Sequence, residues 1–96
     1  MYLKIHKAGP DREVVSLCDK ELIGKKLSEG NIEINVSEKF YKGEELPEDQ
    51  IVEILKNAKS VNILGKKSIA FAIKLGILNE ENVLMIQGVP HAYSQA

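Results

Sequence analysis

Two glycine-led segments carry the residues best suited to bind a small charged ligand. Gly65-Lys66-Lys67-Ser68 follows one short apolar run, and Gly88-Val89-Pro90-His91 follows the next. We expect each segment to leave the end of a β-strand, and the first to open a helix. A helix N-terminus presents unpaired N–H groups and the positive end of the helix dipole, so it attracts anions. The candidate ligand-binding residues are therefore Gly65, Lys66, Lys67, Ser68, Gly88 and His91.

These positions also fit a second interpretation. Exposed lysines in a first helical turn oppose the dipole by ~0.3–1 kcal/mol each, a cost that a bound anion relieves. Without an anion, the segment is a tight turn with solvated lysines, and His91 packs on the sheet edge. The spacing excludes a Walker A loop, because position 60 is Ser60 rather than glycine and Lys67 follows the first lysine. One glycine does not make a dinucleotide fingerprint.

Other reactive side chains form no recognisable catalytic or metal-binding pattern. A nucleophilic Cys18 would need a depressed pKa and a nearby base, whereas the adjacent Asp19 would raise the pKa. A lone cysteine is usually a small buried hydrophobe. The histidines His6 and His91 have no metal-ligand spacing to Cys18 or Asp19. We expect no metal and no cofactor, and a binding protein is favoured over an enzyme.

An aromatic pair with flanking lysines offers a further interpretation. Phe40 and Tyr41 lie between Lys39 and Lys42, which would suit a platform on which nucleic-acid bases stack. Glutamates on both sides favour core anchoring instead. An acidic cluster around Pro47 fits a solvated helix start that stabilises the dipole, with acid/base chemistry as the alternative; it comprises Glu44, Glu45, Glu48 and Asp49.

Periodicity predicts the elements that must position these groups. Alternating or continuous apolar residues predict five strands, at residues 2–7, 12–18, 31–36, 60–64 and 83–87. Helical spacing and end signals predict three helices, at residues 20–29, 47–58 and 66–75, with Asp19 capping the first. The tail at residues 92–96 is expected to fray.

These elements define an α/β fold. We expect a single domain at residues 1–96, with a mixed sheet of about five strands and three helices in the order ββαβαβαβ. The hairpin at residues 2–18 supplies the antiparallel part. Strands 60–64 and 83–87 with the helix between them predict a parallel βαβ unit. Because ligands bind outside the carboxyl ends of parallel strands, a crevice should open between the Gly65 turn and His91.

Composition bounds the class of protein. The 96 residues are 44% hydrophobic and 28% charged, which is typical of a folded globular domain. A net charge of −1 excludes binding of nucleic acid by overall charge alone. With one cysteine, no secretion signal and no apolar run that could span a bilayer, we expect a cytoplasmic protein without a membrane partner.

Four short segments of the sequence together resemble one archaeal family of unknown function. They are Val14–Lys25 (VVSLCDKELIGK), Phe40–Glu44 (FYKGE), Asn62–Gly65 (NILG) and Gly88–Ala92 (GVPHA). The chain is similar to the archaeal domain-of-unknown-function family 424 over nearly its whole length. The resemblance implies a stand-alone cytoplasmic domain with no assigned activity and a connection with translation.

These observations leave the function open between three hypotheses. The first is a small binding module for RNA or a translation-associated protein, which uses the crevice between Gly65 and His91. The second is a small enzyme or a sensor for an anionic metabolite that uses the same crevice, with His91 as acid or base and Cys18 as a further candidate. The third is an oligomeric or subunit-interface protein without a small ligand.

Overall fold

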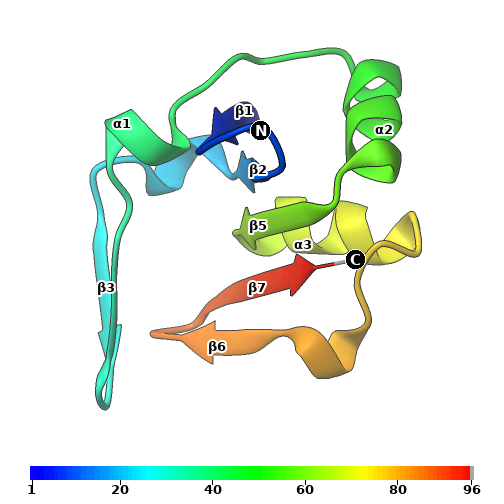
Figure 1. Ribbon diagram of the computed structural model, residues 1–96. Coiled ribbons are helices and arrows are strands. Elements are labelled where there is room, and N and C mark those ends of the chain that lie inside the picture. The colour runs from blue at the N-terminus through cyan, green and yellow to red at the C-terminus, as the bar shows by residue number, and fades with distance from the viewer. Residues whose placement is uncertain (96) are drawn as a thin grey trace.

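The fold is built on a five-stranded mixed sheet. The computed structural model describes residues 1–95 and orders the strands β1-β2-β5-β7-β6 (Figure 1). Their bounds are β1 Tyr2–Lys7, β2 Glu13–Cys18, β5 Ser60–Leu64, β6 Leu84–Ile86 and β7 Val89–Gln95. Strands β2 and β5 are parallel, and the other three neighbouring pairs are antiparallel. The predicted α/β class with a mixed sheet of about five strands is confirmed.

Helices cover both faces of this sheet, but unequally. The longer helices α2 (Glu48–Asn57) and α3 (Lys66–Lys74) pack on one face. The other face carries the one-turn helix α1 (Glu38–Tyr41) and a separate hairpin of β3 (Lys26–Glu29) and β4 (Ile32–Asn35). This hairpin projects beyond the main sheet (Figure 1). None of the helices in residues 1–95 is long and apolar enough to cross a membrane.

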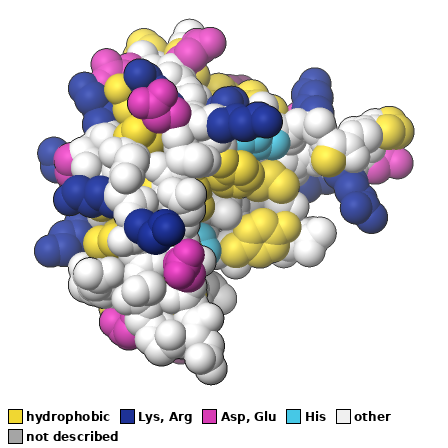
Figure 2. Space-filling model, turned by 90° about the vertical axis from the view of Figure 1, so that its left-hand side faces the viewer, with side chains coloured by type: hydrophobic (Ala, Val, Ile, Leu, Met, Phe, Trp, Pro, Cys, Tyr) yellow, Lys and Arg dark blue, Asp and Glu magenta, His cyan; other side chains and the backbone are white. Residues whose placement is uncertain are grey.

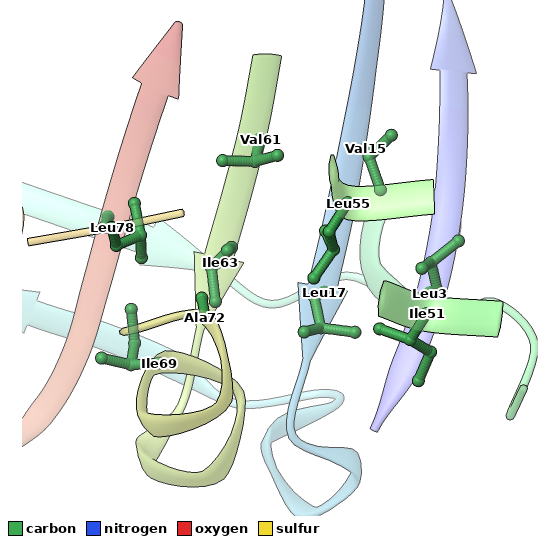
Figure 3. Close-up of a cluster of buried hydrophobic side chains, with 11 residues drawn as sticks. Leu3, Val15, Leu17, Ile51, Leu55, Val61, Ile63, Ile69, Ala72 and Leu78 are labelled. Carbon is green, nitrogen blue, oxygen red and sulfur yellow. The ribbon is translucent and has the colours of Figure 1, made fainter. Parts of the chain in front are cut away.

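Strand alternation divides the buried side chains into two clusters. Val15 and Leu17 of β2 point to the helical face, and Ser16 and Cys18 point to the other. Figure 3 shows the larger cluster, where side chains from both long helices converge on the strands; its buried members include Leu3, Val15, Leu17, Ile51, Leu55, Val61, Ile63, Ile69, Ala72 and Leu78. The smaller cluster lies under the hairpin and α1, and it contains Cys18, Leu22, Leu27, Val36, Tyr41, Leu64 and Ile86.

The expected parallel pairing of residues 60–64 with residues 83–87 is wrong. Strand β7 lies between β5 and β6 and is antiparallel to both. The cause is the two-residue loop Gln87-Gly88, where both residues have positive φ, +52° and +79°. Such a loop matches the twist of a tight hairpin and reverses the chain at once. Residues 92–95 of the tail expected to fray therefore belong to an interior strand, and Ala96 lies outside the described residues.

The helix expected at residues 20–29 is also wrong. Only Lys20–Leu22 forms a 3₁₀ turn, and Gly24 with φ +89° breaks the helical path. Residues 26–29 instead pair with β4, and the resulting hairpin buries Leu27 in the smaller cluster. The third helix is α1, which begins after Ser37, whose hydroxyl accepts from the Phe40 N–H. The order of elements therefore departs from ββαβαβαβ, although the numbers of main-sheet strands and of helices agree.

The interior position of β7 can be tested by a buried charge. Ala92 is 2% exposed, packs in the larger cluster and pairs with Ile63. Replacing Ala92→Asp would bury an unpaired carboxylate, so we expect a loss of more than about 4 kcal/mol in the free energy of unfolding. Urea unfolding monitored by circular dichroism measures this loss. The matched control Gln95→Asp, at an exposed position of the same strand, should unfold near the wild-type midpoint. Equal midpoints for both variants would contradict the topology.

Candidate functional site

The N-terminus of α3 is bound by a carboxylate of the chain itself. Gly65 is the N-cap residue, and the N–H groups of Lys67 and Ser68 donate to the two oxygens of Asp19, at 3.0 Å and 2.8 Å. The Ser68 hydroxyl also donates to Asp19 Oδ1, at 2.7 Å. Asp19 is 3% exposed and Ser68 is fully buried. Asp19 therefore supplies both the hydrogen-bond acceptor and the negative charge that a helix N-terminus attracts.

Parallel pairing brings Asp19 to this helix. Cys18 is the register partner of Leu64, and the next N–H, that of Asp19, donates to the Leu64 carbonyl at 3.0 Å. The predicted role of Asp19 as the cap of residues 20–29 is wrong, because the 3₁₀ turn that follows it receives no side-chain cap. Asp19 caps a helix that begins almost fifty residues later.

Glycine is required at position 65 by this carboxylate. Gly65 has φ +112°, and a Cβ built on it would lie 2.3 Å from Asp19 Cγ and 2.6 Å from Oδ2. Any side chain there would displace the carboxylate from the amides. The Gly65 N–H donates to the Pro90 carbonyl at 2.9 Å, so this turn is also tied to the start of β7.

The predicted ligand residues lie at three places: the start of α3, strand β7 and the turn between β6 and β7. Gly65 and Ser68 bind internal partners at the start of α3, while the side chains of Lys66 and Lys67 are exposed. His91 pairs with Leu64 across the strands, but Ala92 faces α3, so His91 points to the other side. The remaining one, Gly88, lies in the β6–β7 turn. Binding of a ligand by these residues stays a prediction.

The β6–β7 turn is fastened to the projecting hairpin. The Gln87 N–H donates to Glu29 Oε1 at 2.9 Å, and the Ser28 N–H donates to Gln87 Oε1 at 3.0 Å. These reciprocal bonds hold the positive-φ turn against β3. Gly88 lies in the same turn with φ +79°, which gives glycine a structural reason at this position.

A hydrogen-bonded network of polar side chains lies on the face of the sheet opposite to α2 and α3. Asn62 Oδ1 accepts from the Tyr41 hydroxyl and from His91 Nε2, each at 3.2 Å. With Nε2 donating, the other ring nitrogen Nδ1 is left as an acceptor. Burial lowers the pKa of His91 below its usual value, so the ring is neutral at pH 7. Burial is likewise the main cause of the raised pKa of Tyr41.

Aromatic rings continue this network of side chains toward β1. His6 stacks on Phe40 with ring centroids 4.1 Å apart, and Phe40 meets Tyr41 edge to face at 4.7 Å. The Phe40 carbonyl accepts from His6 Nε2 at 2.8 Å and from the Ser16 hydroxyl at 3.4 Å. These contacts dock α1 on the sheet. Tyr41 is buried, whereas Phe40 is half-buried and keeps part of its ring accessible.

We define the His–Tyr face as the surface made by His6, Phe40, Tyr41, Asn62, His91 and Tyr93. Tyr93 completes it, since it is the register partner of Asn62 and is 52% exposed. Figure 2 shows both histidines beside a central hydrophobic patch, with basic and acidic side chains at its margin. The sequence analysis missed Asn62 and Tyr93. The alternation His91, Ala92, Tyr93 was the available signal, and Pro90 and the terminal position obscured it.

The remaining reactive groups form no second site. Cys18 is fully buried, and burial, followed by the charges of Asp19 and Glu21, raises its pKa to about 12. The thiol is therefore protonated at neutral pH and fits the interpretation of a small buried hydrophobe. Within residues 1–95, no group of three or more His, Cys, Asp or Glu side chains is placed to hold a metal ion. Glu45 of the acidic cluster forms an exposed ion pair with Lys20.

The fold and this site define a small α/β protein with a mixed sheet and one partly uncovered polar–aromatic face. The chain belongs to the DUF424 family of proteins of unknown function, whose family model matches residues 6–94. It is also similar to an uncharacterized conserved protein from Methanopyrus kandleri, at 28% identity and a TM-score of 0.79, covering 97% of this chain and 88% of that one. The predicted resemblance is confirmed. No curated protein matches the sequence.

The internal cap predicts a large effect of Asp19 on stability. Asp19→Ala would leave the Lys67 amide, the buried Ser68 amide and the Ser68 hydroxyl without their acceptor, so we expect a loss of about 2–3 kcal/mol in the free energy of unfolding. Asp19→Asn keeps one acceptor oxygen and should lose less. Urea unfolding measures both, with Glu21→Ala, at an exposed neighbouring position, as the control. An Asp19→Ala midpoint equal to that of the wild type would refute the cap.

The lowered pKa of His91 predicts a pH dependence of stability. As the pH falls through about 6.5, the unfolded chain takes up a proton at His91 before the folded chain does. The free energy of unfolding should therefore decrease from pH 7.5 toward pH 5.5, and His91→Gln should remove that part of the decrease. Urea midpoints of both proteins across this range measure it. Parallel curves for the two proteins would show that His91 does not contribute.

Proposed function

We propose that this protein is a small module that binds single-stranded RNA on the His–Tyr face. The observation that carries the proposal is the half-exposed ring of Tyr93, which adjoins Asn62 and His91 on an open sheet surface. Proteins recognise single-stranded RNA by stacking unpaired bases on aromatic side chains and by bonding the base edges. Tyr93 offers the stacking surface, and His91 Nδ1 offers an acceptor for a base N–H.

The distribution of charge favours this face. Lys4 donates to the Lys39 carbonyl at the end of the face near α1, and Lys39 and Lys42 are exposed. The acidic side chains at the start of α2, Glu48 and Asp49, are exposed on a helix that covers the opposite face. Local lysines can therefore contact phosphates although the whole molecule carries a net charge of −1.

The candidate residues of the Gly65 turn have a defined part in this proposal. Lys66 and Lys67 extend from the end of β5, beside the start of β7, and contact the phosphates of an RNA that leaves the face. Gly65, Ser68 and Gly88 hold the backbone in place, and His91 contacts a base. This arrangement replaces an anion at the amides of α3, which Asp19 already occupies. A cytoplasmic location accords with such a role.

Fluorescence polarisation with short fluorescein-labelled oligouridylate and oligoadenylate tests the proposal. Tyr93→Ala should weaken binding roughly 5- to 150-fold, because one stacked base is worth ~1–3 kcal/mol. Ile5→Ala is the matched control, since Ile5 is 44% exposed but lies on the helical face of the sheet. No binding by the wild-type protein, or equal affinities for the wild-type and Tyr93→Ala proteins, would refute the proposal.

Measuring RNA affinity at several salt concentrations distinguishes the contribution of the lysines from that of the aromatic face. The double variant Lys66→Gln, Lys67→Gln removes two phosphate contacts, so the slope of log affinity against log salt should become shallower by about 1.4. The control Lys56→Gln, on α2, should leave the slope unchanged. A wild-type slope in the double variant would show that Lys66 and Lys67 do not contact the phosphates, and it would leave the proposed role of Tyr93 unaffected.

A further inference from the structure

Strand β6 is an apolar edge of the sheet with no charged residue. It forms one end of the strand order, and Leu84 and Met85 are 49% and 48% exposed. The segment Val83–Gln87 contains no Lys, Arg, Asp or Glu. Soluble proteins usually protect an edge strand with charges, prolines or a covering segment, because its free N–H and C=O groups pair with other chains. Strand β6 itself carries none of these charges or prolines, and the Glu29 carboxylate of the hairpin binds only the Gln87 N–H at its end.

The opposite edge of the sheet is protected. Strand β1 carries Lys4 and Lys7, and the N–H and C=O of Leu3 already pair with those of Glu44 at 2.9 Å each. Like charges directly opposite each other in paired strands are destabilising. A second β1 would bring Lys4 and Lys7 of both copies together along one pair of strands, and the N–H and C=O of Leu3 are already paired. The two edges therefore differ, and β6 is the one suited to pair with a strand of its own kind.

The register of β6 leaves one backbone pair directed outward. Ile86 and Val89 flank the two-residue loop, so they form the hydrogen-bonded pair that closes the hairpin. The next pair, Met85 and Pro90, is then the non-hydrogen-bonded one, and Pro90 has no N–H. Consequently the N–H and C=O of Met85 point away from β7, and they bond to no other backbone group within the described chain.

We propose that two copies of this chain pair through β6, antiparallel, around a two-fold axis at Met85. Each Met85 donates its N–H to the carbonyl of the other Met85. Val83 lies opposite Gln87 of the second copy, but the N–H groups of these two residues keep their own partners, the Glu80 carbonyl and the Glu29 carboxylate, so the Met85 pair supplies the backbone hydrogen bonds of the contact. No charged residues of the two β6 strands face each other in this register, and the exposed Leu84 and Met85 side chains of both copies become covered. Pairing with a copy thus satisfies the backbone and the apolar side chains together.

The projecting hairpin extends this surface. Ile32 of β4 is 42% exposed and pairs with Glu29, whose carboxylate accepts from the Gln87 N–H at the end of β6. The Ile32 side chain adds exposed apolar area beside strand β6. Because β1 is protected, a two-fold contact uses up the unprotected edge of the five-stranded sheet, and growth through this sheet stops at the dimer rather than continuing into a filament.

Sedimentation velocity over a range of protein concentrations tests the dimer. The wild-type mass should rise from one chain toward two with concentration, in the micromolar range or above, because three-residue strands make a small interface. Met85→Lys places like charges opposite each other at the two-fold axis and should give one chain throughout. The matched control Ile5→Lys adds the same charge at an equally exposed position of β1 and should dimerise like the wild type.

The outcomes are distinguishable from a folding defect and from RNA binding. Circular dichroism checks that both lysine variants keep the wild-type fold, as their exposure predicts. A wild-type protein that stays one chain at every concentration, or a Met85→Lys variant that still dimerises, would overturn the proposal. Since neither measurement contains nucleic acid, failure of the dimer leaves the proposed RNA surface unaffected, and the converse also holds.

Discussion

The carboxylate of Asp19 joins the two halves of the chain where β2, β5 and α3 meet. It accepts two amides of α3 and the Ser68 hydroxyl, while its own N–H bonds to the end of β5. A buried carboxylate is tolerable only when its oxygens are satisfied, and here the donors come from a helix N-terminus whose dipole favours negative charge. This contact depends on the parallel register of β2 and β5, and it requires glycine at position 65. It also explains why this turn resembles an anion site, because its anion is part of the chain.

The same sheet has two faces with different physical characters. The helical face is closed by α2 and α3 over the larger apolar cluster. The other is covered only by a one-turn helix and a hairpin, which reach Cys18 and Leu64 but leave the face beyond Asn62 open. Elements this short cannot exclude water from a whole sheet surface. Polar and aromatic side chains can therefore remain there, hydrogen-bonded to one another and accessible to a ligand.

Sequence patterns predicted the elements whose identity depends on local burial. Residues 2–7, 60–64 and 66–75 were assigned from periodicity, since alternation and helical spacing record which side of each segment meets the core. The same patterns could not assign residues 20–29, because a buried Leu27 fits a helix or a strand equally well. Nor could they reveal β7, since Pro90 weakens a strand signal and Gln87 is not a usual residue for a positive-φ turn.

The candidate site divides in the same way between sequence and tertiary structure. By itself, the sequence determined that Gly65 ends a strand, that Lys66 opens a helix and that the chain is a DUF424 protein. Only the tertiary structure decided which groups meet: Asp19 with Ser68, and Asn62 with Tyr41 and His91. Each meeting joins residues at least twenty positions apart. Side-chain periodicity reports whether a residue is buried, but the order and direction of strands decide what it is buried against.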